Sequence, residues 1–274
     1  MKPFLSIITP VLNNERFISQ AIENYLSEAN SKTELIIVDG GSTDRTIEII
    51  KSYASNRQDI KWISERDSGQ SDAMNKGIRL ASGDYISFLN VDDYYSKGTF
   101  IRVIQILQQK PFINFLVGDC NVWNAENKLI FVNRPSKLEK WHVLSGYYFP
   151  VNPTAYFYKK QLHSEVGFYK EDNHYNMDLE FIIQARLYTP FYYMSEIWGN
   201  FRMLPNTKTF SDMEENLLEK RKQDLLRIYF NQVSFYIRFR IKLYRFKRIF
   251  FPIIVHFLKR LRDKIKFEIK KIKG

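Results

Sequence analysis

The sequence predicts an α/β fold in which helices flank a mainly parallel central sheet. Over residues 1–110, short apolar runs typical of buried strands alternate with segments whose apolar residues recur at helical spacing. A regular β-α-β-α order favours parallel strands joined by right-handed crossovers. Of the 274 residues, 45% are hydrophobic, including 22 Phe and 17 Tyr. This composition supports a large core and excludes disorder over most of the length.

The first βα unit begins with an apolar strand at Phe4–Thr9, which Pro10 and a polar turn at Asn13–Glu15 bring to an end. The helix after it is indicated by apolar residues at helical spacing, namely Ile18, Ala21, Ile22 and Tyr25. A strand followed by such a helix is the repeating unit of a parallel α/β sheet.

Two further units follow in the same order. Glu34–Val38 is predicted as a second buried strand, and Ser42 is a suitable N-cap for a helix that runs through Ile50. A third strand is predicted at Ile60–Glu65, and a helix at about Ser71–Ala81. The alternation therefore continues as far as the glycine that opens the fourth strand.

The fourth strand, Gly83–Leu89, is followed closely by the adjacent carboxylates Asp92 and Asp93. Open α/β sheets bind ligands at the carboxyl ends of their strands. Neighbouring carboxylates repel each other unless a cation shares them, so a hard ion such as Mg²⁺ or Mn²⁺ suits this position. The alternative is that these aspartates only cap the next helix.

Each of the four predicted strands is followed by a polar cluster, at Thr9–Asn13, Asp39–Asp44, Glu65–Asp72 and Asn90–Asp93. Independent turns could produce each cluster, and Asp39 could serve only as a turn former. Beside the glycines that follow it, Asp39 could also accept a hydrogen bond from a nucleotide base or ribose. Neither a Gly-x-Gly-x-x-Gly pattern nor a Walker motif is present. Because parallel strands end at one edge, we expect the four clusters to lie together.

The chain changes character after residue 110. Asn114–Asp119 and Lys128–Val132 are predicted as strands on either side of a turn, an antiparallel addition to the sheet. The remaining predicted elements are an aromatic-rich loop at Trp141–Pro153, a helix at Met177–Leu187, a strand at Tyr192–Arg202 and basic helices from Ser211 onward.

Cysteine usage and hydropathy indicate where the protein works. The single cysteine, Cys120, excludes an internal disulfide framework, leaves a Cys-based zinc site without ligands and fits a reducing compartment. The apolar part of Met1–Pro10 is too short for a signal peptide, and no run approaches the ~20 apolar residues that span a bilayer. These features predict a soluble or peripheral protein in a reducing compartment. Together with the basic C-terminal segment described next, they lead us to expect a cytoplasmic protein, peripheral on the inner face of the cell membrane.

Positive charge is concentrated at the C-terminal end. From Arg221 onward there are 17 Lys or Arg and 3 Asp or Glu, a net charge of +14; since the whole chain carries +11, the first 220 residues carry −3. Residues 228–273 interleave aromatic and aliphatic side chains with these cations. Such helices suit an anionic membrane surface. The alternatives are a nucleic-acid partner, which we do not expect, and a solvated hairpin packed on the preceding domain.

Four segments in order carry a resemblance to a known family: Ser6–Asn13, Ile36–Thr46, Asp72–Gly77 and Gly83–Asp93. Together they resemble the motif series of family-2 glycosyltransferases with the GT-A fold. The match is dense over the first ~100 residues and looser to about Lys208.

The resemblance implies how the chain is divided. Residues 1–215 would form a GT-A catalytic domain, with a nucleotide-sugar-binding half at 1–110 and an acceptor-binding half at 111–215. Residues 216–274 would form the basic aromatic helical tail.

The resemblance also implies a donor site and a metal. The residues expected to bind the donor are Thr9, Pro10, Val11, Asn13, Asp39, Asp67, Asn75, Asn90, Val91 and Asp92. Asp92 and Asp93 would hold Mn²⁺ or Mg²⁺ on the diphosphate. Asn90 departs from the family's Asp-x-Asp because an amide supplies no charge, and Met74 stands where many relatives have Arg.

In the second half, Asp178 matches the position of the family's general base. The alternative is that Asp178 only supports the first turn of its helix. Glu180, Trp141, Arg202 and Lys208 are further candidates for acceptor or phosphate contacts. Residues two apart do not share a helix face, so Asp178 and Glu180 should not both reach the acceptor.

The resemblance implies an inverting, metal-dependent transfer of a sugar from a nucleotide-diphosphate donor. We expect the donor to be a UDP-sugar and the reaction to belong to cell-surface polysaccharide synthesis. The acceptor would be a hydroxyl of a glycan or lipid-linked molecule. One base implies a single displacement, and the lack of a second carboxylate beside the sugar argues against a hydrolase. The alternative is a catalytically inactive nucleotide-sugar-binding or regulatory module. A nucleic-acid-binding protein would leave the strand-end motifs unexplained.

Overall fold

The structure is a computed structural model of the full chain. It describes all residues except 1, 174, 206, 208–216, 249 and 251–274. Lys208 and the last part of the predicted tail therefore lie outside the described residues.

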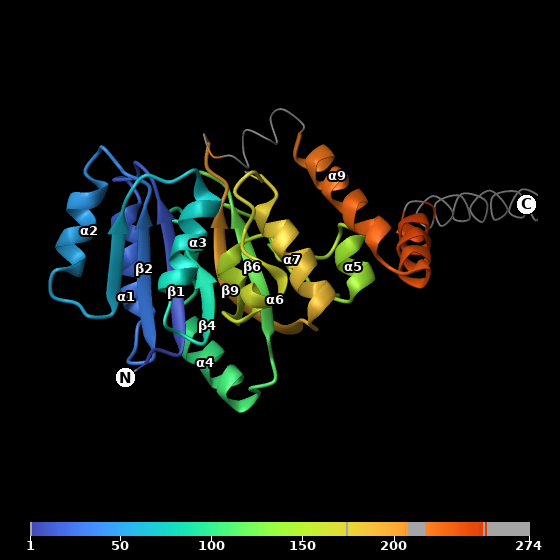
Figure 1. Ribbon diagram of the computed structural model, residues 1–274, viewed down its shortest axis with the longest axis horizontal. Coiled ribbons are helices and arrows are strands. Elements are labelled where there is room, and N and C mark those ends of the chain that lie inside the picture. Colours follow the sequence, from blue (N-terminus) through green and yellow to red (C-terminus); the bar gives the residue numbers. More distant parts are fainter. Residues whose placement is uncertain (1, 174, 206, 208–216, 249, 251–274) are drawn as a thin grey trace, which may run out of the picture.

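A single mixed sheet runs through the described part of the molecule (Figure 1). Its strands are β1 (Leu5–Val11), β2 (Thr33–Asp39), β3 (Ile60–Ser64), β4 (Tyr85–Phe88), β5 (Tyr94–Tyr95), β6 (Phe115–Trp123), β7 (Leu129–Asn133), β8 (Tyr156–Lys159) and β9 (Tyr192–Arg202). The order is β3-β2-β1-β4-β8-β6-β9-β5, and β7 pairs with β6. The pairings make β1, β2, β3, β4, β6 and β9 run in one direction and β5, β7 and β8 in the other. The predicted, mostly parallel α/β sheet is confirmed.

Helices cover both faces of the sheet. They are α1 (Ile18–Glu28), α2 (Thr46–Ala54), α3 (Gln70–Leu80), α4 (Thr99–Gln109), α5 (Lys140–Leu144), α6 (Leu162–Val166), α7 (Met177–Tyr188) and α9 (Leu217–Gln232), with a 3₁₀ turn η1 (Pro153–Ala155). Alternate residues of β1 point to opposite faces: Ile7 packs in one core with α1 and α4, whereas Ile8 packs in the other with α3 and α7. Burial on both faces explains why these strands read as continuous apolar runs.

The helix after β2 begins later than predicted. Ser42 does not cap it, because the Ser42 hydroxyl donates to Asp39 instead. The amide of Thr46, the first residue of α2, donates to Oδ1 of Asp44 at 3.0 Å. The turn between strand and helix is therefore closed by Asp39, and Asp44 supplies the acceptor at the helix start.

Sequence patterns in the second half were less informative. The stretch Trp141–Pro153, predicted as a loop, includes most of the short helix α5. Strand β8, which was not predicted, inserts antiparallel between β4 and β6. Four apolar residues between polar neighbours can form a strand, a helix turn or a loop, so only the neighbouring strands decide the outcome.

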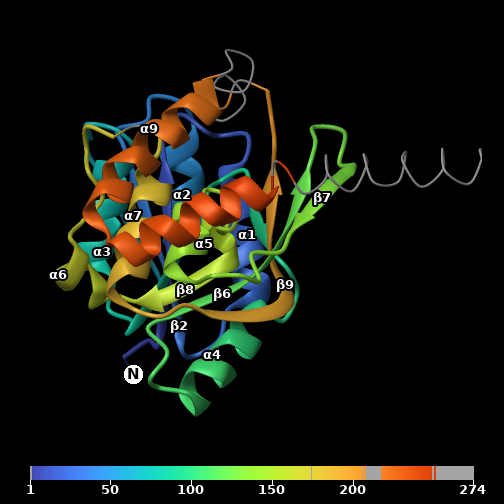
Figure 2. The same cartoon turned by 90° about the vertical axis from the view of Figure 1, so that its right-hand side faces the viewer.

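The described C-terminal part is a helical hairpin: α9 is followed by a second helix at residues 235–248. Leu226 of α9 and Ile241 of the second helix are buried in the same core as α7. Figure 2 shows both helices lying across the end of the molecule. Within the described residues, none of the helices has the length and apolar character needed to cross a bilayer.

Candidate active site

The polar clusters after the parallel strands meet at one edge of the sheet, where α3 and α7 also begin (Figure 1). The loops after β1 and β2 are tied together there. The amide of Asn13 donates to the Ser42 hydroxyl at 2.7 Å, and Oδ1 of Asn13 accepts from the amide of Thr43 at 2.8 Å. Asn13 has a φ of 47°, a left-handed conformation that asparagine tolerates better than most residues. Asn13 therefore organises the edge, as well as lying on it.

Asp39, the last residue of β2, is buried, and its carboxylate holds the loop that follows. Oδ2 accepts from the amides of Gly41 and Ser42, each at 3.0 Å, and from the Ser64 hydroxyl at 2.7 Å. Oδ1 accepts from the Ser42 hydroxyl. Four donors leave Asp39 little capacity for a ligand, so its main contribution is to shape the βα turn.

Asp67 lies against this turn. A Cβ atom at Gly40 would stand 2.4 Å from Oδ2 of Asp67, so any larger residue there would require the Asp67 carboxylate to move. Oδ1 of Asp67 accepts from the amide of Gly69 at 3.0 Å, whereas Oδ2 accepts from none of the residues described. Burial raises the pKa of Asp67, and the charges of Asp72 and Asp39 add to this effect. Asp67 thus offers an open acceptor beside a close backbone approach.

The other predicted donor contacts differ in exposure. Thr9, Pro10 and Val11 are buried at the end of β1, and the Thr9 hydroxyl has no partner among the described residues. Asn75 corrects the prediction. Its side chain is buried, its amide donates to the Tyr169 carbonyl at 2.9 Å, and its oxygen accepts from the Tyr169 amide at 3.0 Å. Asn75 therefore clips α3 to the segment before α7 and does not face the donor edge.

Asp93 is the centre of a buried network. Its Oδ2 accepts from the amide groups of Asn90 at 3.0 Å and Asn152 at 2.8 Å, and its Oδ1 accepts from the Arg202 backbone amide at 3.1 Å. Burial, together with the neighbouring charge of Asp92, raises the pKa of Asp93 to about 8. The network joins the loop after β4 to η1 and β9, which gives this aspartate a supporting position instead of the predicted direct contact with a metal.

Asp92 is different. It is half-buried, and apart from its own backbone amide none of the described residues donates a hydrogen bond to its carboxylate. Burial raises the pKa of Asp92, an effect that its own backbone amide and the charge of Arg202 reduce. An open carboxylate in a partly desolvated position attracts a cation or a hydrogen-bond donor.

Arg202, at the end of β9, braces the same loop. Its Nε donates to the carbonyl of Asp92, and Nη2 donates to Gln20 at 3.0 Å. The guanidinium stacks over the Phe17 ring, 5.2 Å from its centroid. The Arg202 side chain, which was predicted to contact acceptor or phosphate, therefore already holds the backbone of Asp92 in place.

Asp178 is the second residue of α7, and its helix start is tied to α3. The Ser71 hydroxyl donates to Sδ of the neighbouring Met177 at 2.9 Å, and Gln70 donates to Asn90 at 3.3 Å. Asp178 therefore lies at the same edge as the Asn90–Asp93 loop. Its Oδ1 is buried without a hydrogen-bond partner, and burial raises the pKa of Asp178 to about 6.

Glu180 points elsewhere, as its spacing from Asp178 predicts. It accepts from Lys170 at 2.5 Å, Asn173 at 2.8 Å and the Tyr229 hydroxyl at 2.8 Å. Burial alone would raise the pKa of Glu180, but these hydrogen bonds outweigh it and lower the pKa. Glu180 therefore joins α7 to α9 and is not an acceptor contact.

Trp141 also differs from the prediction. Its ring packs edge-on against Tyr244, with 5.3 Å between centroids, and Arg240 lies 4.6 Å above it. Trp141 thus anchors the C-terminal hairpin to α5. Trp141 was a candidate for an acceptor or phosphate contact, and an aromatic residue in a sequence does not by itself distinguish a ligand contact from a packing contact.

Asn152 and Gln70 are site residues that the sequence did not single out. Asn152 is buried and donates to Asp93, and Gln70 donates to Asn90. Asn152 precedes a proline, which restricts its backbone to extended conformations, but this signal predicts a turn and not a partner. Both roles depend on tertiary contacts across many residues of chain.

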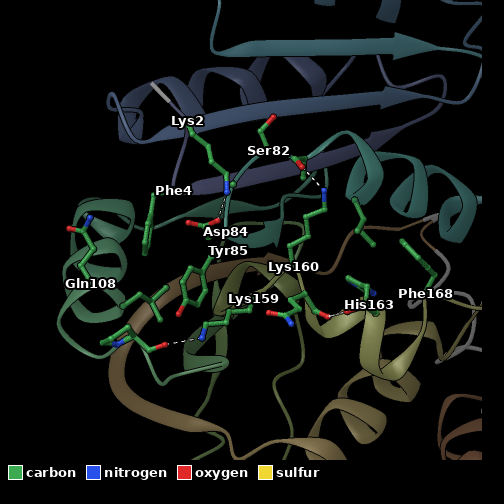
Figure 3. Close-up of a pocket in the computed structure, with 17 residues that line it drawn as sticks. Lys2, Phe4, Ser82, Asp84, Tyr85, Gln108, Lys159, Lys160, His163 and Phe168 are labelled. Atoms are coloured by element: carbon green, nitrogen blue, oxygen red, sulfur yellow. Dashed lines mark hydrogen bonds and ion pairs between the residues drawn. The ribbon is translucent and has the colours of Figure 1, made fainter.

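A separate hollow of about 970 Å³ lies at the opposite edge of the sheet (Figure 3). Its lysines are already engaged. Lys160 donates to the carbonyl of Ala81 at 2.6 Å, Lys159 donates to that of Pro111 at 2.8 Å, and Lys2 pairs with Asp84 at 2.5 Å. Two of these contacts satisfy carbonyls just past the ends of α3 and α4, which is a structural role.

Comparison with known proteins identifies the family. The family model described as Glycosyl transferase family 2 matches residues 6–167. The glycosyltransferase EpsJ of Bacillus subtilis, itself uncharacterized, is 39% identical over 109 residues, which are 40% of this chain and 32% of EpsJ. The chain therefore spans about a third of the length of that relative.

Solved structures share the fold. Staphylococcus aureus TarS 1–349 in complex with UDP-GlcNAc superposes with a TM-score of 0.63 at 17% identity, covering 76% of this chain and 61% of TarS 1–349. The mannosyltransferase PcManGT of Pyrobaculum calidifontis, in complex with GDP-Man and Mn²⁺, gives 0.57 at 16% identity over 73% of this chain and 57% of PcManGT. The GT-A fold that the resemblance implied is confirmed.

Proposed function

The chain belongs to glycosyl transferase family 2, and we propose that it transfers a sugar from a nucleoside-diphosphate donor to an acceptor hydroxyl. The observation that carries this proposal is that two open carboxylates, Asp92 and Asp178, lie at the same edge of the sheet. The donor would lie along that edge, with its nucleoside near Asp67 and its diphosphate near Asp92. Asp39 and Asn13 would hold the loops at this edge.

The residues present fit a divalent ion at the diphosphate. Mg²⁺ is usually bound by one or two carboxylates together with substrate phosphates and water, and Asp92 offers one open carboxylate of this kind. No cluster of three or more His, Cys, Asp or Glu able to hold a metal occurs among the described residues, so the donor would complete the coordination. Bound Mn²⁺ or Mg²⁺ would act as a Lewis acid that neutralises charge on the departing diphosphate. Asp93 would position Asp92 through the shared loop.

Asp178 would act as the general base. It removes the proton from the acceptor hydroxyl as that oxygen attacks the anomeric carbon, while the bond from that carbon to the diphosphate oxygen breaks. A pKa of about 6 leaves Asp178 mostly ionised at neutral pH, yet basic enough to take a proton. Attack from the face opposite the leaving group inverts the anomeric configuration.

The donor and acceptor classes follow from chemistry and relatives. TarS 1–349 was solved with UDP-GlcNAc, which supports a UDP-sugar here. The basic hairpin at the C-terminal end favours an acceptor at an anionic membrane, such as a lipid-linked glycan of the cell surface.

One experiment tests the activity and the base together. The full chain is screened against UDP- and GDP-sugars, with Mn²⁺ or Mg²⁺, for binding and slow hydrolysis. Asp178→Asn should lower the rate of donor hydrolysis or sugar transfer by about 10²- to 10⁴-fold. It should leave donor affinity unchanged, because the base acts on the acceptor. Asp172→Asn, an exposed carboxylate six residues earlier, is the matched control and should behave as wild type. Near-normal turnover of Asp178→Asn would exclude it as the base.

The second candidate is a catalytically inactive nucleotide-sugar-binding module. Two observations favour it: the Asn90 amide is used on Asp93, and Met74, where many relatives have Arg, is buried in the core. Donor binding by the wild-type chain without any metal-dependent hydrolysis or transfer would support this alternative.

A further inference from the structure

The helix at residues 235–248 has two apolar faces. Ile237, Ile241 and Tyr244 form the inner face, which packs against the body of the protein; Ile241 is fully buried, and Tyr244 contacts Trp141 of α5. These contacts fix how the helix is rotated on the protein. The opposite face of the helix therefore points away from the protein, at the end of the molecule that faces the viewer in Figure 2.

The outer face is aromatic and exposed. At about 100° per residue, its members fall within an arc of about 100° around the helix axis. They are Phe235 (76% exposed), Tyr236 (63%), Phe239 (54%), Leu243 (41%), Phe246 (55%) and, just beyond, Phe250 (43%). We call these six residues the outer stripe. A contiguous apolar stripe of this kind on a folded surface indicates a contact that the isolated chain does not make.

Cations border the outer stripe on both sides. Arg238, Lys242 and Arg245 lie along one border, and Arg240 and Lys247 along the other. Arg240 also stacks on the Trp141 ring, and Arg245 also donates to the carbonyls of Leu144 and Ser145 at 3.4 Å. The exposed lysines Lys242 and Lys247 are therefore the cations best placed to reach headgroups. This arrangement is that of a helix lying in a membrane interface, with rings at the acyl boundary and cations reaching the headgroups.

A hollow adjoins one border of the outer stripe. It measures about 480 Å³, lies between α9 and the second helix, and is lined in part by Arg227, Lys242 and Arg245. Three cations face it against the single acidic residue Asp224. The charge of this hollow suits a phosphate group, and its position places that phosphate at the level of the stripe's border.

We propose that the outer stripe is a membrane-docking surface for anionic phospholipid, with a lipid phosphate held in the hollow between α9 and the second helix. This inference deepens the proposed function by naming the surface that would bring the active site to a membrane-bound acceptor. Only the link to a membrane-bound acceptor rests on the proposed function, because docking itself needs neither donor nor turnover.

The test is binding of the full chain to phosphatidylcholine vesicles with and without phosphatidylglycerol, measured by sedimentation at low and high salt. Wild type should bind only the anionic vesicles, and added salt should weaken binding. The triple variant F239S/L243S/F246S should bind at least about tenfold more weakly, because the apolar insertion is lost. The double variant K242E/K247E should lose about tenfold at low salt and depend less steeply on salt than wild type does.

Phe112→Ser is the matched control, since Phe112 is equally exposed (60%) but lies before β6. It should bind vesicles as wild type does. All substituted residues are exposed, so the temperature of thermal unfolding should be unchanged. A variant that unfolds at a lower temperature than wild type is replaced by the single change Phe246→Ser. Equal binding by the triple variant and wild type overturns the proposal. The proposal is also overturned if wild type does not bind vesicles but self-associates, or binds nucleic acid, through a contact that the triple variant loses. Loss of vesicle binding with normal donor hydrolysis would leave the proposed function intact.

Discussion

The buried carboxylates of this protein fall into two regions that differ in how fully they are hydrogen-bonded. At the ends of β2 and β4, Asp39 and Asp93 accept four and three hydrogen bonds, respectively. At the same edge, Asp92 and Oδ1 of Asp178 accept none from any other residue that the structure describes. A saturated carboxylate holds in place the loops that donate to it, whereas an open one keeps lone pairs available for a cation or a further donor. This difference distinguishes the aspartates that hold loops in place from the aspartates that are available to react with or bind a ligand.

The largest effect should come from breaking a saturated carboxylate. Asp93→Ala leaves the amides of Asn90, Asn152 and Arg202 without their acceptor in a buried place. We expect a loss of about 3–5 kcal/mol in the free energy of unfolding, measured by denaturant titration. Asp92→Ala is the contrasting change, because it removes no hydrogen bond from any other residue that the structure describes. It should leave stability nearly unchanged and abolish any response to divalent ions; equal destabilisation by both changes would remove the distinction.

The pH dependence of turnover should sharpen the assignment of Asp178. Burial raises the pKa of Asp178 from 3.8 to about 6, so the base remains protonated at a higher pH than an exposed aspartate. Turnover should therefore fall by about tenfold per pH unit below pH 6, and be flat just above it. A profile that stays flat down to pH 4 would contradict the assignment.

The same shift has a consequence for stability. Because the folded-state pKa is raised, the folded protein binds the proton more tightly than the unfolded chain. The stabilisation from this group is present below about pH 4 and is lost as pH rises to about 6. Asp178→Asn should remove this part of the pH dependence in denaturant titrations at a series of pH values.

The smallest effect is expected at Asn75. Replacing it with Ala breaks two hydrogen bonds to the Tyr169 backbone in a buried place, which should cost about 1–3 kcal/mol in unfolding free energy. Because Asn75 does not face the donor edge, KM for the donor should not change in a steady-state assay. A raised KM without loss of stability would instead favour the donor contact predicted from the motif.

How well the sequence predicted each element depended on the distance over which its interactions act. The strands β1 to β4 and the helices between them follow from local periodicity, and each was located to within a few residues. Asn13, Asp39 and Asp92 were singled out because polar clusters mark the ends of those strands, whereas Asp178 was singled out by the family resemblance, and their roles stay predictions. Strand β8 and helix α5 were missed, since short apolar runs carry no period of their own.

By itself, the sequence determined the parallel half of the sheet, the family resemblance and the concentration of positive charge at the C-terminal end. Only the tertiary structure decided which carboxylates are saturated, because the partners of Asp93 come from residues 90, 152 and 202. It also decided that Trp141 and Glu180 contact the C-terminal hairpin, through Tyr244 and Tyr229 respectively. The physical reason is that periodicity and turn chemistry act between neighbours in the chain, whereas hydrogen-bond saturation depends on segments that meet only after folding.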